Sequence, residues 1–159
     1  MSDVIIDGMV RVTWATAVAS IAAPTTTELN AGIALEALLT ADGLRGFQPE
    51  TAAVDTSALV STFNTSAPGR ESFSGMGLML KRQSGTDTVY STLQKGTAGF
   101  VVIRRGVAAA TAWTAAQAVE VYPVVCGREQ HQDPEANSLW RYLVPLMLSS
   151  QPNLRAAVA

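Results

Sequence analysis

The residues best suited to chemistry lie close together, between positions 126 and 135. Cys126 and His131 are the one cysteine and the one histidine of the chain, and a thiol near an imidazole is a nucleophile beside its base. The sequence indicates no third group to orient the imidazole, and isolated cysteines behave mostly as small buried hydrophobic residues. We therefore predict no catalytic residues and expect that the protein is not an enzyme.

The same segment also carries potential metal ligands: Glu129, His131, Asp133 and Glu135. The chain has no second histidine, and the charged run from Arg128 to Asn137 is typical of a solvated loop between strands. We predict no metal site. The sequence holds no glycine-rich phosphate loop either, so we expect no cofactor.

The charge of the chain argues against a grip on nucleic acid. Its formal net charge is −2, which leaves no basic surface to hold phosphates. A weakly acidic protein can still surround DNA without binding it, because like charges repel.

Composition indicates one domain with an unusual surface. The 159 residues suit a single domain over 1–159. Charged residues make up 15% of the chain, against about 25% in an average protein, so part of the exterior is expected to be buried against partners. Val12 to Ala23 resembles a signal peptide, but Asp3 and Asp7 precede it, and no run is long enough to span a membrane. We expect a soluble, unexported protein.

The elements that must position these residues are mostly strands. They are expected where apolar residues alternate or run together, at Val10–Thr16, Phe73–Arg82, Phe100–Ile103, Val119–Cys126 and Leu139–Leu148. The first of these is expected to be half-buried, because its apolar residues alternate with others. Pro123 is expected to place its strand at a sheet edge or a bulge. The end of the chain, 149–159, is expected to be a flexible tail.

One good helix and one short, interrupted helix are expected. Thr25 and Glu28 form a capping box before a short helix that Gly32 interrupts. The better helix is Gly85–Gly96, with Thr86 as its cap. Ile33 to Leu39 is open to either helix or strand, with a hairpin or sharp bend at Asp42-Gly43.

The stretch from Gly46 to Arg82 is expected to form one long polar hairpin, with its tip near Ser66 to Arg70 and Pro68-Gly69 setting the reversal. Such a hairpin cannot bury its own faces and usually needs a neighbour. Together the elements predict a mainly β (α+β) fold: a β-sandwich or barrel with one flanking helix and a long hairpin loop.

Four further residues are expected to contact other subunits. Trp113 and Trp140 are large aromatic residues of the kind that fill a core or anchor an interface. Arg104 and Arg105 are adjacent on a strand and so face opposite ways. We predict that they pair with acidic residues of the 128–135 loop on a neighbour.

Several segments together resemble the tail tube (major tail) proteins of long-tailed bacteriophages, most closely those of actinobacterial phages. The resemblance rests on Gly85–Val89, Gly96–Gly106, Thr111–Val124 and Asp133–Asn137, with support from Thr27–Gly32 and Thr40–Leu44. None of these segments is a catalytic signature.

The resemblance implies a subunit that forms rings, commonly six-fold, which stack into the tube through which DNA leaves the capsid. Its implied partners are further copies of itself and the tape measure, terminator and distal tail proteins, in a virion tail assembled in the host cytoplasm. The implied lumen is acidic, and Asp55 and Glu71 on the hairpin are its candidates for lumen or ring contacts. With no decorating domain after Leu148, we expect a plain tube.

Two other functions fit the sequence less well. A tail terminator or head–tail joining protein would also form a ring around DNA, but a single ring. A small β-barrel ligand-binding protein would need a concave apolar pocket with convergent polar groups.

Overall fold

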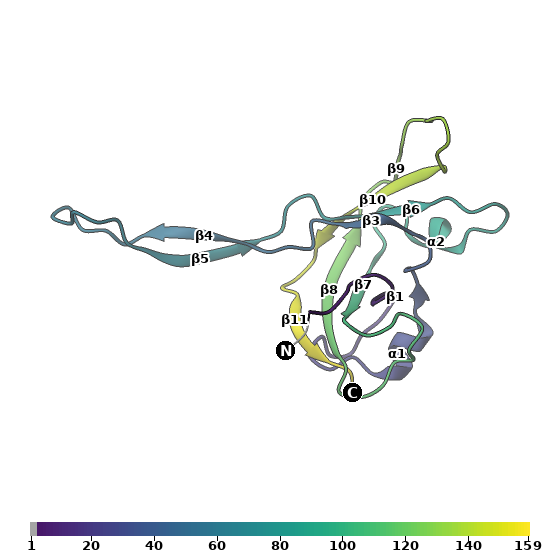
Figure 1. Ribbon diagram of the computed structural model, residues 1–159, viewed down its shortest axis with the longest axis horizontal. Coiled ribbons are helices and arrows are strands. Elements are labelled where there is room, and N and C mark those ends of the chain that lie inside the picture. The colour runs from purple at the N-terminus through teal and green to yellow at the C-terminus, as the bar shows by residue number, and fades with distance from the viewer. Residues whose placement is uncertain (1–2) are drawn as a thin grey trace.

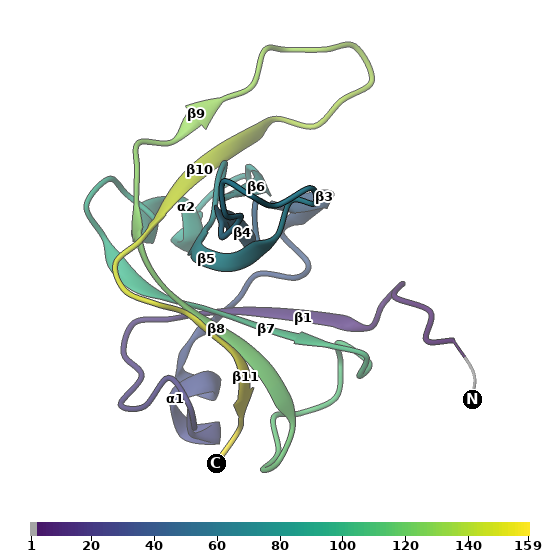
Figure 2. The ribbon, with the colours of Figure 1, turned by 90° about the vertical axis from the view of Figure 1, so that its left-hand side faces the viewer.

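A computed structural model describes residues 3–159, and its main feature is a curled antiparallel sheet that forms a half-barrel (Figures 1 and 2). The strand order is β2-β1-β7-β8-β10-β6-β3, with β11 beside β8 and β9 beside β10. The strands are β1 Val10–Ala15, β2 Ile33–Ala34, β3 Leu39–Arg45, β6 Gly77–Lys81, β7 Ala98–Arg105, β8 Ala118–Cys126, β9 Gln130–His131, β10 Arg141–Leu148 and β11 Asn153–Ala157. The predicted mainly β class is confirmed.

The main core lies inside the curl. It joins alternate residues of the long strands, with Val12 and Trp14 from β1, Val101 and Ile103 from β7, and Tyr122 from β8 among them. This alternation is the period-two pattern of strands that share one buried face.

A second, smaller core covers the outer face of β7 and β8. Val102 and Val121 meet Leu29 of helix α1 (Thr26–Ala31), Trp113 and the penultimate residue Val158 there. The expectation that the first strand is half-buried is therefore wrong, because Thr13 and Ala15 on its other face are buried too.

The first helix follows its sequence signals. Helix α1 spans Thr26–Ala31, and Thr25 Oγ1 accepts a hydrogen bond from the Glu28 amide at 3.2 Å while Glu28 Oε2 accepts one from the Thr25 amide at 2.8 Å. Gly32 ends it. The predicted capping box is confirmed.

The second helix is shorter than predicted. Helix α2 spans Thr88–Thr92, inside the expected 85–96, and its cap is Asp87, whose Oδ1 accepts from the Tyr90 amide at 3.0 Å. Thr86 as the cap was a wrong prediction. No helix among residues 3–159 is long and apolar enough to cross a membrane.

Pro123 does not mark an edge or a bulge, because β8 is a central strand. The Pro123 carbonyl accepts from the Ser149 amide at 3.0 Å, so the proline nitrogen faces the same side. On that side β8 pairs with β10 up to Val124 and with β11 from Val121, and Pro123 falls where one partner gives way to the other. Its missing N–H therefore costs no ladder hydrogen bond.

Asp42 and Gly43 form no hairpin turn. They lie inside β3, where pairing with β6 shifts between Leu39 and Leu44, so the extra residues form a bulge. A Cβ on Gly43 would lie 2.7 Å from the Met79 carbonyl oxygen, so glycine permits this close approach.

The C-terminal segment is not a flexible tail. Strand β11 pairs with β8, Ala156 and Val158 are buried, and the Ala159 carbonyl accepts from the Thr26 amide at 3.4 Å. The prediction for 149–159 missed this pairing because the segment Asn153–Ala157 is too short and too mixed to show a strand pattern.

Candidate assembly surfaces

The long hairpin is an arm that projects from the half-barrel (Figure 1). Strands β4 Glu50–Asp55 and β5 Ser66–Ser72 form a separate two-stranded sheet, and every residue of β4 is exposed. The predicted hairpin is confirmed, but its tip is not at 66–70. Pro68 pairs with Ala53 inside the ladder, and the reversal occupies residues 56–65.

The root of the arm is fixed by aromatic contacts. Phe47 precedes β4 and Phe73 follows β5, and both rings stand edge-on to Tyr122, with centroids 4.9 and 5.9 Å away. Gly46 lies beside Gly75, where a Cβ would come within 2.5 Å of backbone atoms. The two chains of the arm therefore leave the body side by side at a fixed point.

A polar chain continues from this root to the surface. The Tyr122 hydroxyl donates to Glu120 Oε2 at 2.9 Å, and Glu120 Oε1 accepts from Arg105 Nε at 3.0 Å. Burial and the neighbouring Glu120 carboxylate raise the pKa of Tyr122. Arg105 thus has an intrachain partner, and its side chain is still 42% exposed.

The tip of the arm is ordered by its own hydrogen bonds. The Thr56 amide donates to the Thr65 carbonyl at 3.0 Å, and the Thr65 amide donates to Ser57 Oγ at 2.9 Å. On this frame three large apolar side chains stand in solvent: Leu59, Val60 and Phe63. We call these three residues the apolar tip.

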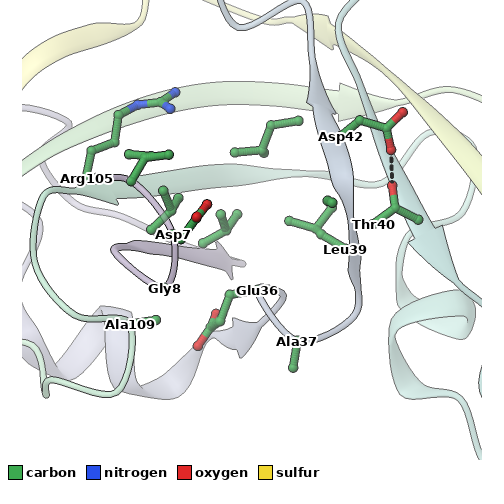
Figure 3. A pocket seen from close by; sticks show the side chains of 14 residues that line it. Asp7, Gly8, Glu36, Ala37, Leu39, Thr40, Asp42, Arg105 and Ala109 are labelled. Atoms are coloured by element: carbon green, nitrogen blue, oxygen red, sulfur yellow. Dashed lines mark hydrogen bonds between the residues drawn. The ribbon is translucent and has the colours of Figure 1, made fainter. Parts of the chain in front are cut away.

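The open side of the half-barrel holds a groove of about 540 Å³ (Figure 3). Its apolar wall comes from near both ends of the sheet, with Val10 and Val12 of β1, the neighbour of the edge strand β2, facing Leu39 and Leu44 of the edge strand β3. Strands β1 and β3 do not pair with each other, so the groove is the seam where the sheet fails to close. We call it the seam groove.

Charged side chains border the seam groove. They are Asp7, Glu36, Asp42 and Arg105. In Figure 3 Arg105 and Asp42 stand at opposite sides, and Thr40 Oγ1 donates to Asp42 Oδ1 at 2.9 Å. That hydrogen bond is the main cause of a lowered pKa for Asp42. Asp42 also lies 3.3 Å from Arg45, and Glu36 lies 3.9 Å from Arg11. The border thus carries paired charges around an apolar wall.

Comparison with known proteins shows which family has this architecture. The sequence matches the family described as phage tail tube protein over residues 1–159. The chain belongs to the phage tail tube protein family. A cryo-electron microscopy structure of the anti-feeding prophage (AFP) baseplate, 6-fold symmetrised, contains a chain with the same fold, at TM-score 0.63 and 12% identity, with 98% of each chain covered. No curated protein matches the sequence.

Within this tail tube fold, Arg104 has a role that the sequence did not indicate. Its side chain is fully buried and donates to the carbonyls of Ala108, Thr111 and Ala112 at 2.8–3.2 Å, and to Gln117 Oε1 at 2.9 Å. Burial and the nearby Arg11 guanidinium lower its pKa. Arg104 holds the 106–117 loop of its own chain, which leaves it no exposed surface for the predicted contact with a neighbour.

Trp113 belongs to the same buried arrangement. The guanidinium carbons of Arg104 and Arg11 lie 4.8 and 4.9 Å from the centre of its ring, and the ring is 4% exposed in the second core. Its large side chain fills that core and is not available as a surface anchor.

Trp140 does lie on the surface. It is 62% exposed beside Leu139, and its indole nitrogen donates to His131 Nδ1 at 3.2 Å. The Arg82 guanidinium carbon lies 5.8 Å from its ring and 4.0 Å from that of Tyr90. Trp140 therefore remains a candidate for subunit contacts.

The two residues weighed as nucleophile and base lie in different environments. His131 is exposed in β9, whereas Cys126 is buried in the main core, where burial raises the pKa of its thiol to about 11. Among residues 3–159 no group of three or more His, Cys, Asp or Glu side chains is placed to hold a metal ion.

Asp55 and Glu71 lie at opposite ends of the arm. Asp55 pairs with Ser66 next to the tip, and Glu71 pairs with Thr51 near the root. Ser66, the partner of Asp55, is five positions from Glu71 along β5, or about 16 Å. A hydrogen bond from the Ser57 amide lowers the pKa of Asp55. Both side chains are exposed.

Sequence reasoning missed the aromatic root, the apolar tip and the seam groove. The root carried a signal, because Gly46-Phe47 and Phe73 to Gly75 mirror each other around the hairpin. The tip was hidden by the wrong position of the turn. The groove joins residues of β1 and β3 that are far apart in the chain, and no local pattern marks it.

Proposed function

We propose that the chain is the structural subunit of a bacteriophage tail tube, which polymerises as stacked rings of six subunits to form the conduit for DNA ejection. The observation that carries the proposal is an exposed arm on a member of the tail tube family, matched over its whole length. A two-stranded sheet exposed on both faces is marginal alone, so contact with another subunit would stabilise it.

Charge supports a conduit. The net charge is −2, and the arm carries three carboxylates, Glu50, Asp55 and Glu71, against one cation, Arg70. A lumen of this sign repels the DNA backbone and lets it pass. We place Asp55 and Glu71 at the lumen or at ring contacts, and Arg105 and Trp140 at contacts between subunits.

The same proposal sets the partners and place of the protein. Further copies of the chain are its main partner, with tape measure, terminator and distal tail proteins at the ends or inside the tube. The protein would assemble in the host cytoplasm, remain in the virion tail and have no enzymatic activity. Kinship to actinobacterial phages is part of the proposal and rests on the sequence resemblance alone.

Electron microscopy tests the proposal directly. Purified protein, negatively stained over a concentration series and sized by chromatography alongside, should form hollow tubes of uniform width. Closed single rings at every concentration would favour a terminator or joining protein instead. A monomer that also fails to assemble when tail initiator proteins are added would overturn the tube.

A further inference from the structure

Stacking needs two complementary surfaces on one chain, and the structure offers a protruding one and a hollow one. We propose that the apolar tip of one subunit docks in the seam groove of a second copy of this chain. This inference rests on the proposed tail tube and adds to it the place where the arm binds.

The tip suits burial. Leu59 and Phe63 are exposed, Phe63 to 77%, and the hydrogen bonds of Thr56 and Thr65 already fix the loop that displays them. A loop ordered before binding loses less conformational entropy when it docks. No charged residue lies between positions 55 and 70, so the tip can enter an apolar site without desolvating a charge.

The groove suits a tip of this size and character. At about 540 Å³ it lies within the range of roughly 300–1,000 Å³ for concave binding sites, and Val10, Val12, Leu39 and Leu44 give it an apolar wall. It also lies beside the outer edge of β3 and the first residues of β1, which pairs with β2 only at Thr13 and Trp14, and unpaired edges are normally covered in native proteins.

Charge favours the tip over another exposed apolar segment, Val4 to Ile6. That segment lies between Asp3 and Asp7, and Ile6 and Asp7 themselves line the groove. A second copy's Val4–Ile6 would bring two further carboxylates to this border. The tip is neutral, and its hydroxyl groups can donate to Asp42 or Glu36 at the border.

The two surfaces lie on different parts of one molecule. A contact between two different surfaces can repeat from one copy to the next. Unless the rotation between copies closes a ring, the repeat continues and extends a stack. Docking of tip into groove therefore supplies the axial contact that the proposed tube requires.

Cysteine cross-linking tests the docking. One chain carries Leu59→Cys at the tip and another carries Ala41→Cys at the groove border, and the native Cys126 is buried. After mixing under assembly conditions and mild oxidation, we expect a disulfide between positions 59 and 41, identified by mass spectrometry of the cleaved product. The matched control is Ala136→Cys, an exposed alanine on the 132–140 loop, which should give little cross-link with Leu59→Cys.

The outcomes separate this inference from the proposed function. Tubes without the 59–41 disulfide would overturn the docking and leave the tube intact. The disulfide without tubes would support the docking and overturn the tube. If neither tubes nor the disulfide form, both the docking and the tube are overturned. A second variant, Phe63→Ser, should raise the concentration needed for assembly about tenfold, because it removes a large apolar contact. Unchanged assembly would contradict the docking.

Discussion

The ring of Phe47 stands edge-on to that of Tyr122, with centroids 4.9 Å apart and planes at 84°, and this contact joins the arm to the half-barrel. Phe47 is 6% exposed, whereas Phe63 at the other end of the arm is 77% exposed. A phenylalanine therefore packs in the core at the root of the arm, whereas the phenylalanine at the tip is exposed to solvent.

Phe47→Ala should destabilise the subunit by about 3–5 kcal/mol, because it removes a buried ring and leaves a cavity beside Tyr122. Urea unfolding of the free subunit measures the change. Phe63→Ala is the matched control, and its free energy of unfolding should stay within about 0.5 kcal/mol of the original protein. Equal losses in the two variants would contradict the division between root and tip.

Arg104→Met should cost about 3 kcal/mol or more, because the carbonyls of Ala108, Thr111 and Ala112 lose their buried donor. The 106–117 loop should also become sensitive to protease. Arg105→Met removes a half-exposed guanidinium from the next position and should cost no more than about 1 kcal/mol. If both variants unfold at the same urea concentration, Arg104 does not hold the loop.

Asp87 should make the free energy of unfolding depend on pH in the acidic range. Burial acts to raise the pKa of this carboxyl, but hydrogen bonds from the amides of Gln83 and Tyr90 and from Arg82 outweigh it and hold the pKa below its usual range. A lowered pKa in the folded state gives stability that is present above about pH 4 and is lost as pH falls through the folded value.

Asp87→Asn tests this dependence. The free energy of unfolding of the original protein should fall more steeply between pH 5 and the acid limit of folding than that of the variant. At pH 7 the variant should be less stable by about 1 kcal/mol or more, since it loses the ion pair with Arg82 and weakens the cap of α2. Parallel pH profiles would show that Asp87 is not the group responsible.

The reactivity of the Cys126 thiol should indicate whether the chain is folded. Its burial and a thiol pKa of about 11 leave almost no accessible thiolate at neutral pH, so a thiol reagent should label the native protein very slowly. Labelling should become fast across the urea range in which the fold is lost. Rapid labelling of the folded protein would mean that β8 opens locally.

Reversing the charge of carboxylates on the arm tests whether the arm contributes to the proposed DNA conduit. Asp55→Lys with Glu71→Lys changes the charge of two exposed positions by +4 in total, which should block assembly or slow DNA passage. Plaque counts of a phage that carries the pair measure the effect, and Asp133→Lys with Glu135→Lys in the exposed 132–140 loop gives the same charge change off the arm. Normal infectivity of the arm variant would exclude a role for both residues.

The features that could be predicted from the sequence depend on residues that are close together in the chain. Thr25 and Glu28 cap a helix because they are three residues apart, and the hairpin from Gly46 to Arg82 follows from its polar, turn-rich composition. Pro123 misled because its place depends on where β10 ends and β11 begins. Arg104 misled because its partners lie in a loop whose path only the folded chain defines.

The separation of the arm from the main sheet has a consequence for how tails diverge. The ladder of β4 and β5 has its own register and shares no strand with the half-barrel, so its length is not set by the core. Inserting two residues into each strand would keep every side chain on its face and lengthen the arm by about 7 Å. In the proposed tube, the distance that the arm spans is thus a quantity that mutation can adjust in steps, while the folding of the half-barrel is left unchanged.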